Sequence, residues 1–298
     1  MRLKHKMRIW WQRLEETPSD KRTVKEFLDE RNFNWKILSQ PCYMEIDGKF
    51  VKVPNHQISV RNDTNRAISV VKGRLNLLDN EECFSIGNLF LEEFPSAKFV
   101  SCGDIMDEKE SYLLILLKKE VVCGDEFGFW LTVSNGFDGR NAVNCSLTMV
   151  RSKDHAVFQM SDFERERIWT LSRIDIEIKY EFIVERVKNY IDWAKSECEK
   201  MKLKKIDLNE TISPIFDIDW RKKKRVNKNL ALIKEWTREI YLKNGGESLY
   251  DLYFSLSDYY CNGKRLRVDK LGDDKRFQMA MIKRFYELFD YGKKMTDL

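Results

Sequence analysis

Apolar residues follow two different spacings along the chain. Before about residue 163, short apolar runs alternate with polar positions and are interrupted by turn-forming residues, which is typical of β-strands. After that point, apolar residues recur every three or four positions, the spacing of helices that bury one face. The pattern predicts an α+β protein with a basic N-terminal arm and helix at 1–31, a β-rich mixed domain at 32–162, and a docked helical region at 163–298.

The strongest signal in the β-rich part is a hairpin. Residues 43–46 and 49–53 flank Asp47-Gly48, a pair that is preferred in two-residue hairpin turns. Pro54 is expected to end the second strand, because proline cannot donate a hydrogen bond to a neighbouring strand. Further strands are predicted at 58–61, 67–71, 98–102, 111–118, 127–134 and 142–150.

Two helices are predicted before residue 100. The first spans 19–31, with Ser19 or Asp20 as its N-cap. Its buried face is expected to carry Val24, Phe27 and Leu28. The second helix has Asn80 as its N-cap and ends at Pro95.

Four helices are predicted in the last part of the chain, at 177–203, 226–240, 248–261 and 274–292. Ser248 and Asp251 have the spacing of a capping box at the start of the third. The first is expected to bury one continuous apolar stripe, formed by Ile183, Val187, Ile191, Ala194, Cys198 and Met201.

Composition then restricts the class of protein. A hydrophobic fraction of 43% over 298 residues is enough for a core, and only 13 Gly and 5 Pro exclude a collagen-like or low-complexity chain. Lys and Arg (53) exceed Asp and Glu (48) by five, so the chain as a whole is not a polycation. Any basic surface must therefore be local.

One segment is strongly basic. Between Lys200 and Lys228 there are ten Lys or Arg against four Asp or Glu, an excess of six. Such a segment can neutralise a phosphate backbone without reading its sequence, and a neighbouring tryptophan can stack on an unpaired base. The predicted nucleic-acid-binding residues here are Arg221, Lys222, Lys223, Lys224, Arg225, Lys228 and Trp220. The alternative is a solvated helix start whose lysines only keep the surface soluble.

The N-terminal arm is a second basic element. Arg2, Lys4, Lys6, Arg8 and Arg13 precede the first acidic residue, and Trp10 lies among them. Cations beside an aromatic ring suit a flexible single strand, so Trp10 is a candidate for base stacking. Alternatively, the arm is amphipathic and its tryptophans pack on the domain or on a second subunit.

Cysteine usage and hydropathy indicate the compartment. The seven cysteines are widely spaced and form no C-x-x-C pair, and the three histidines are far apart, so neither a disulfide framework nor a zinc site is expected. No apolar run approaches the ~18 residues of a membrane-spanning helix, nor is there a signal-peptide core. We expect a protein of the bacterial cytoplasm, with no cofactor, no bound metal and no membrane partner.

A metal-dependent nuclease is the one enzymatic alternative. Asp175, Glu177 and Lys179 form an acidic-x-acidic-x-Lys string that resembles the metal-binding core of many nucleases. Such a site needs a further carboxylate upstream, for which Asp162 is the nearest candidate.

The order of motifs resembles that of the domain-of-unknown-function 932 family, a group of phage- and plasmid-borne proteins. The resemblance spans roughly residues 32–290. It depends on the order of the C-terminal helices, with an aromatic-rich one after Gly245-Gly246, and on five earlier segments, at residues 34–37, Pro41 with Asp47-Gly48, 70–73, 80–84 and 131–139. The chain departs from the family where an Arg-Val-Val-Cys-x-Asn string is usual, because only Arg151 of that string is present. The resemblance implies a role in mobile-element DNA metabolism or in the contest with the host.

Three functions therefore remain open. The first is a non-enzymatic phage- or plasmid-borne accessory protein that binds nucleic acid through its phosphate backbone, above all single-stranded DNA. The second is a non-enzymatic protein-interaction factor, either a virion component or an inhibitor of a host defence factor, in which the aromatic helices could bury a homo-oligomer interface. The third is the nuclease.

Overall fold

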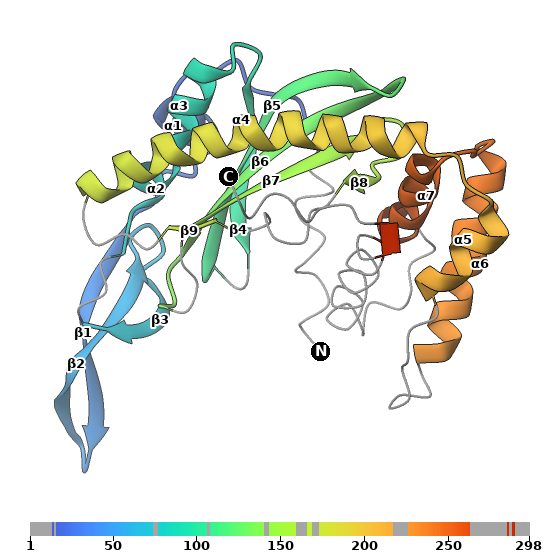
Figure 1. Cartoon of the computed structure of the whole chain (residues 1–298). Coiled ribbons are helices and arrows are strands. Elements are labelled where there is room, and N and C mark those ends of the chain that lie inside the picture. Colours follow the sequence, from blue (N-terminus) through green and yellow to red (C-terminus); the bar gives the residue numbers. More distant parts are fainter. Residues whose placement is uncertain are drawn as a thin grey trace. The chain divides into compact units, whose positions relative to one another are not determined.

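The computed structural model describes residues 14, 16–73, 77–105, 108–139, 143–158, 166–168, 173–216, 226–262, 285 and 288–289 (Figure 1). The strands are β1 (Ile37–Ile46), β2 (Lys49–Arg61), β3 (Arg66–Lys72), β4 (Lys98–Ile105), β5 (Glu110–Val122), β6 (Asp125–Gly136), β7 (Val143–Arg151), β8 (Val157–Phe158) and β9 (Glu166–Ile168). The helices are α1 (Val24–Glu30), α2 (Asn80–Phe84), α3 (Ile86–Glu93), α4 (Arg173–Leu203), α5 (Leu208–Phe216), α6 (Val226–Lys243) and α7 (Leu249–Asn262). Strands dominate the first half and helices the second, so the fold is α+β, as the pattern predicts.

The chain forms two compact units that alternate along the sequence. Unit 1 comprises Met1–Lys118, Trp130–Leu147 and Arg165–Val187, and unit 2 comprises Lys119–Phe129, Thr148–Glu164 and Lys188–Leu298. Strands β5, β6 and β7 each contribute residues to both units. The division of the sequence at residues 31 and 162 remains a prediction.

A three-stranded sheet in unit 1 contains the predicted hairpin. Its strand order is β1-β2-β3, and all its pairs are antiparallel. Asp47 and Gly48 have φ values of 49° and 76°, the left-handed backbone that a tight hairpin turn of this kind requires. The hairpin prediction is therefore confirmed.

The second strand of this hairpin does not end at Pro54, so that prediction is wrong. β2 continues to Arg61, but its register against β1 jumps from Pro41 opposite Gln57 to Tyr43 opposite Lys52. Pro54 lies among the extra β2 residues at this irregularity. Its missing N–H therefore removes no hydrogen bond from the β1–β2 ladder, and the strand can run on.

The N-cap of α1 is Thr23, not Ser19 or Asp20. The Thr23 hydroxyl accepts a hydrogen bond from the Glu26 backbone N–H, and the Glu26 carboxylate accepts one from that of Thr23. Ser19 instead donates its backbone N–H to the carbonyl of Phe99 in β4, which is an edge strand. Val24, Phe27 and Leu28 are buried, as predicted.

The N-cap of α2 is Asp79, one residue before the predicted Asn80. Asn80 is the first helical residue, only 1% exposed, and its side-chain oxygen accepts a hydrogen bond from Asn135. The predicted single helix is divided at Ser85 into α2 and α3. Phe94 forms the C-cap of α3, immediately before Pro95.

The larger sheet has the order β4-β5-β6-β7-β8, with β9 paired to β7. Strand β5 is buried from Ser111 to Leu117, and the central strand β6 is buried from Phe127 to Leu131. At the β8 edge, the buried Ser257 hydroxyl of α7 accepts from the Val157 N–H (2.9 Å) and donates to the Val157 carbonyl (2.7 Å). These bonds satisfy backbone groups that an edge strand would otherwise expose.

The helical predictions hold for the residues that the structure describes. Every member of the stripe from Ile183 to Met201 is buried in α4. Ser248 and Asp251 form the predicted cap of α7. Helix α5 was not expected, and of the predicted 274–292 helix only residues 285, 288 and 289 are described, all helical. In the described part of the chain, no helix combines the length and apolarity needed to cross a membrane.

Candidate interaction surface

Most of the residues predicted to bind nucleic acid lie outside the described residues. This applies to Trp10, Trp220, Arg221, Lys222, Lys223, Lys224 and Arg225. The backbone of Lys228 belongs to α6. Their role remains a prediction.

The lysines that precede this segment are described, and three of them form ion pairs within unit 2. Lys200 lies 2.7 Å from the Glu197 carboxylate, and Lys202 lies 2.9 Å from that of Asp251. Lys205 pairs with Glu247. Because each of these charges has an opposite charge beside it, they add little to an open positive surface.

The nuclease candidates Asp175, Glu177 and Lys179 belong to the backbone of α4, and their role remains a prediction. Asp162 lies outside the described residues. Among the described residues, no three His, Cys, Asp or Glu side chains come together as a metal site would require.

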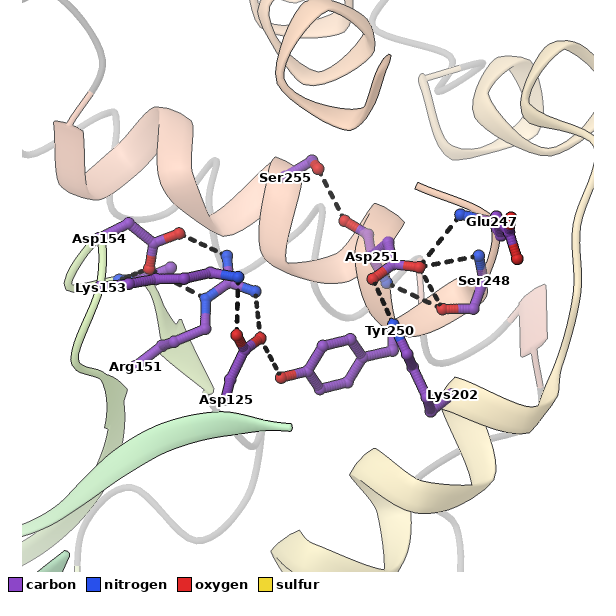
Figure 2. Close-up of polar contacts among 11 residues, drawn as sticks. Asp125, Arg151, Lys153, Asp154, Lys202, Glu247, Ser248, Tyr250, Asp251 and Ser255 are labelled. Atoms are coloured by element: carbon purple, nitrogen blue, oxygen red, sulfur yellow. Dashed lines mark hydrogen bonds and ion pairs between the residues drawn. The ribbon is translucent and has the colours of Figure 1, made fainter. Parts of the chain in front are cut away.

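A polar cluster surrounds Arg151, at the end of β7 (Figure 2). The Arg151 side chain is only 4% exposed. Its Nε and Nη2 donate to the two carboxylate oxygens of Asp154, at 3.0 and 2.5 Å, and its Nη1 donates to Asp125 at 3.2 Å. Its guanidinium carbon lies 4.4 Å from the ring centre of Phe254 in α7. The cation is thus both paired and stacked.

Asp125, at the start of β6, is the hub of this cluster. It also accepts hydrogen bonds from the Lys153 ammonium (2.7 Å) and the Tyr250 hydroxyl (2.9 Å). Burial acts to raise the pKa of Asp125, but these two bonds and the Arg151 charge outweigh it, so its pKa is lowered. Burial raises the pKa of Tyr250, and the Asp125 charge adds to this effect.

A second group of polar contacts fixes the start of α7 (Figure 2). Asp251 accepts hydrogen bonds from the Ser248 hydroxyl (2.6 Å), from the backbone N–H groups of Ser248 and Glu247, and from Lys202. The Lys202 ammonium also lies 5.1 Å from the ring centre of Tyr250. The two polar groups are therefore linked through neighbouring residues of α7.

These contacts describe a structural cluster rather than an open site. All three guanidinium nitrogens of Arg151 are engaged, and Asp125 has three partners. The cluster joins the ends of β6 and β7 to helix α7 within unit 2. Its residues lie far apart in the sequence, and Arg151 was singled out there only as the one residue present of the Arg-Val-Val-Cys-x-Asn string.

The β1–β2 hairpin contains the most exposed apolar surface among the residues described in unit 1. From here on, "the arm" means residues Tyr43–Lys52, the part of the hairpin that β3 does not reach, and not the N-terminal arm (Figure 1). Its exposed apolar residues are Tyr43 (53% exposed), Met44 (50%), Ile46 (47%), Phe50 (77%) and Val51 (45%). The described residues place no further strand beside β1.

The register distributes these residues over both faces of the arm. Tyr43 is opposite Lys52 and Glu45 is opposite Phe50, so these four side chains share one face, which we call the aromatic face. The other face, which we call the aliphatic face, carries Met44, Ile46, Lys49 and Val51. An antiparallel ribbon usually exposes a polar face to solvent, whereas this ribbon exposes apolar side chains on both faces.

The arm carries no net charge. Glu45 and Asp47 are balanced by Lys49 and Lys52. The carboxylates lie on β1 and at the turn, and both ammonium groups lie on β2. An arm of this composition does not attract a polyanion.

The hairpin was predicted from the sequence, but its exposure was not. The available signal was the string Tyr43-Met44-Glu45-Ile46, in which apolar residues occupy both alternating sets of positions. A strand that packs one face on a core usually alternates apolar with polar residues. A run that breaks this rule within a hairpin predicts either burial or contact on both faces.

No family model, curated protein or solved structure matches the chain. The resemblance to the domain-of-unknown-function 932 family therefore remains a prediction made from the order of motifs.

Proposed function

We propose that this protein is a non-enzymatic interaction factor that binds a protein partner through the arm. The observation that carries the proposal is the exposure of five large apolar side chains on both faces of one two-stranded ribbon. With each of them about half exposed, the two faces of the arm together expose roughly 500 Å² of apolar surface. Apolar surface gathered on one element of a soluble domain is typical of a contact site.

The stability of the ribbon supports the same function. A two-stranded hairpin is at best marginally stable in water, because too few side chains are buried between its strands. Covering the arm with a partner would remove its apolar side chains from water and stabilise the ribbon at the same time. Its zero net charge favours a protein surface over a phosphate backbone.

The test is photo-crosslinking from the arm in the cell that expresses the protein. In the test variant, a photoreactive side chain replaces Phe50, which is 77% exposed. In the matched control, the same side chain replaces Leu203, which lies at the end of α4 and is 83% exposed. We expect discrete protein adducts from position 50, which include adducts to another copy, and none of comparable yield from position 203. Equal yields from the two positions, or no adduct from position 50, would refute the proposal.

Nucleic-acid binding is the second candidate, supported by the run Arg221-Lys222-Lys223-Lys224-Arg225 with Lys228. If this segment neutralises phosphates, affinity for a labelled single-stranded oligonucleotide should fall steeply with salt. The variant Lys222/Lys223/Lys224→Ala should reduce both the affinity and the salt slope. Unchanged binding by this variant, or no binding at low salt, would dismiss this function without affecting the first.

A further inference from the structure

The side chains of the arm indicate which partner it binds. Building on the proposed function, we propose that the arm binds a second copy of this chain, aromatic face against aromatic face, around a two-fold axis. The pairing is isologous, so the same residues meet on both sides of the interface.

The charge pattern on the aromatic face is the first argument. The pairs Tyr43–Lys52 and Glu45–Phe50 are successive cross-strand pairs on this face, so their four side chains form a rectangle. Tyr43 and Phe50 occupy one diagonal, and Glu45 and Lys52 occupy the other. The face thus has one charge of each sign beside two aromatic rings.

This arrangement is complementary to itself. A two-fold axis close to the Tyr43–Phe50 diagonal places each ring near its counterpart in the other copy. The same rotation exchanges the other two corners, so that each Glu45 meets the Lys52 of the second copy. The two ribbons then cross at a steep angle, which is one of the two common ways in which sheets pack. A foreign partner would have to match this pattern, whereas a second copy matches it by symmetry.

The choice of face follows from the side chains. The aromatic face carries the most exposed apolar residue of the arm, Phe50, and a tyrosine. Aromatic residues are enriched in protein interfaces, and tyrosine is enriched among the few positions that carry most of the binding free energy. The aliphatic face carries one charge, Lys49, and no carboxylate. Two aliphatic faces in contact would bring only like charges into the interface.

The available area sets the strength of the pair. The two rings and the aliphatic stems of Glu45 and Lys52 offer about 400 Å² in each copy. A total of about 800 Å² lies below the standard range of roughly 1,200–2,000 Å² for stable complexes. We therefore expect a weak, reversible dimer whose population depends on protein concentration.

The first measurement is light scattering on the purified full chain over a concentration series at low salt. The wild-type mass should rise from 35.7 kDa towards twice that value as concentration increases. Phe50→Asp should abolish the increase, whereas Val51→Asp, the neighbouring residue on the aliphatic face, should leave it in place. Circular dichroism should confirm that both variants remain folded, since both positions are exposed.

The second measurement tests the contact between Glu45 and Lys52 across the two-fold axis. Glu45→Lys alone places two lysines opposite each other at both ends of the interface, and Lys52→Glu alone does the same with two carboxylates. Each variant should therefore remain monomeric. An equal mixture of the two should form dimers, because each altered residue then meets an opposite charge, and 1 M salt should weaken this rescue.

Three results would overturn the inference: a wild-type mass that stays at 35.7 kDa at every concentration, dimers abolished by Val51→Asp as fully as by Phe50→Asp, or a mixture that does not associate. A monomeric protein that still forms adducts to another protein from position 50 would overturn this inference and leave the proposed function intact. The absence of any adduct from that position would refute the proposed function itself.

Discussion

Replacing Arg151 with methionine is the most direct test of how unit 2 is held together. Arg151→Met keeps an unbranched apolar side chain that can still pack on Phe254, but it removes the positive charge and every hydrogen bond of the guanidinium. Asp154 and Asp125 then lose a cationic partner, although their side chains are only 20% and 17% exposed. We expect a large loss of stability because these carboxylates remain largely shielded from water.

The size of this loss follows from the geometry. Removing one partner of a buried ion pair costs about 3–5 kcal/mol. Asp125 retains Lys153 and Tyr250 as hydrogen-bond donors, and water reaches both carboxylates in part, so we expect a value near the lower end, about 3 kcal/mol. With a urea m-value of about 2 kcal/mol per molar, the unfolding midpoint should fall by about 1.5 M.

Urea unfolding followed by circular dichroism provides the measurement, since guanidinium salts would screen the charges. The matched control is Lys119→Met, which removes an ion pair with Glu126 whose side chains are 56% and 50% exposed. This exposed pair should contribute less than about 1 kcal/mol. Adding Asp154→Asn to Arg151→Met should recover part of the loss, because it removes a carboxylate that has lost its partner. If Arg151→Met is no more destabilising than Lys119→Met, the cluster does not stabilise unit 2.

Three further substitutions test neighbouring features of unit 2. Because burial raises the pKa of Tyr250, the unfolded chain ionises this group first, near pH 10, and the folded state loses stability above that pH. Tyr250→Phe should reduce this alkaline loss of stability. At neutral pH the same variant should be less stable by about 1–2 kcal/mol, because it lacks the hydrogen bond to Asp125. Burial acts to raise the pKa of Asp251, but hydrogen bonds outweigh it and lower the pKa. The contribution of this carboxylate to stability is therefore complete above about pH 4 and is lost as pH falls through the folded pKa. In urea titrations, Asp251→Asn should flatten the decline of stability in acid. A Cβ atom at Gly246 would lie 2.6 Å from the ring of Tyr241, which is 3% exposed, so Gly246→Ala should cost about 1–3 kcal/mol and lower the thermal midpoint.

The features predicted correctly are those whose cause lies within a few residues. The Asp47-Gly48 turn and the Ser248–Asp251 cap depend on adjacent backbone groups, and both are present. The apolar stripe of α4 depends on helical spacing alone, and it is buried along its described length. Local sequence was sufficient for the order of these elements and for the fold class.

The predictions that failed did so for two different reasons. Thr23 and Glu26 have the local spacing of a capping box, and the choice of Ser19 or Asp20 as N-cap overlooked it. Pro54 ends a strand unless a register shift provides a place without a ladder hydrogen bond, and β1 and β2 contain such a shift. That shift depends on the pairing of two strands and cannot be read from the residues next to Pro54.

The same distinction applies to the candidate sites. The Arg151 cluster joins residues 125, 151 and 250, and no sequence motif connects positions so far apart. The arm, by contrast, is contiguous, and the sequence predicted its shape. What it could not show is that β3 stops short of the arm, because that depends on the register of three strands.

The contrast between the Arg151 cluster and the arm also decides where binding free energy is available. A ligand that approached Arg151 would have to displace Asp154 or Asp125, and breaking such a pair costs about 3 kcal/mol or more before any new contact forms. A partner that covers the arm displaces only water, and each of the five exposed apolar residues gains from leaving it. Full burial of one such side chain contributes about 1.5–3 kcal/mol, so the five exposed side chains of the arm offer several kcal/mol towards the cost of association. Among the described residues, the polar cluster therefore serves stability, and the arm offers free energy for the binding that we propose.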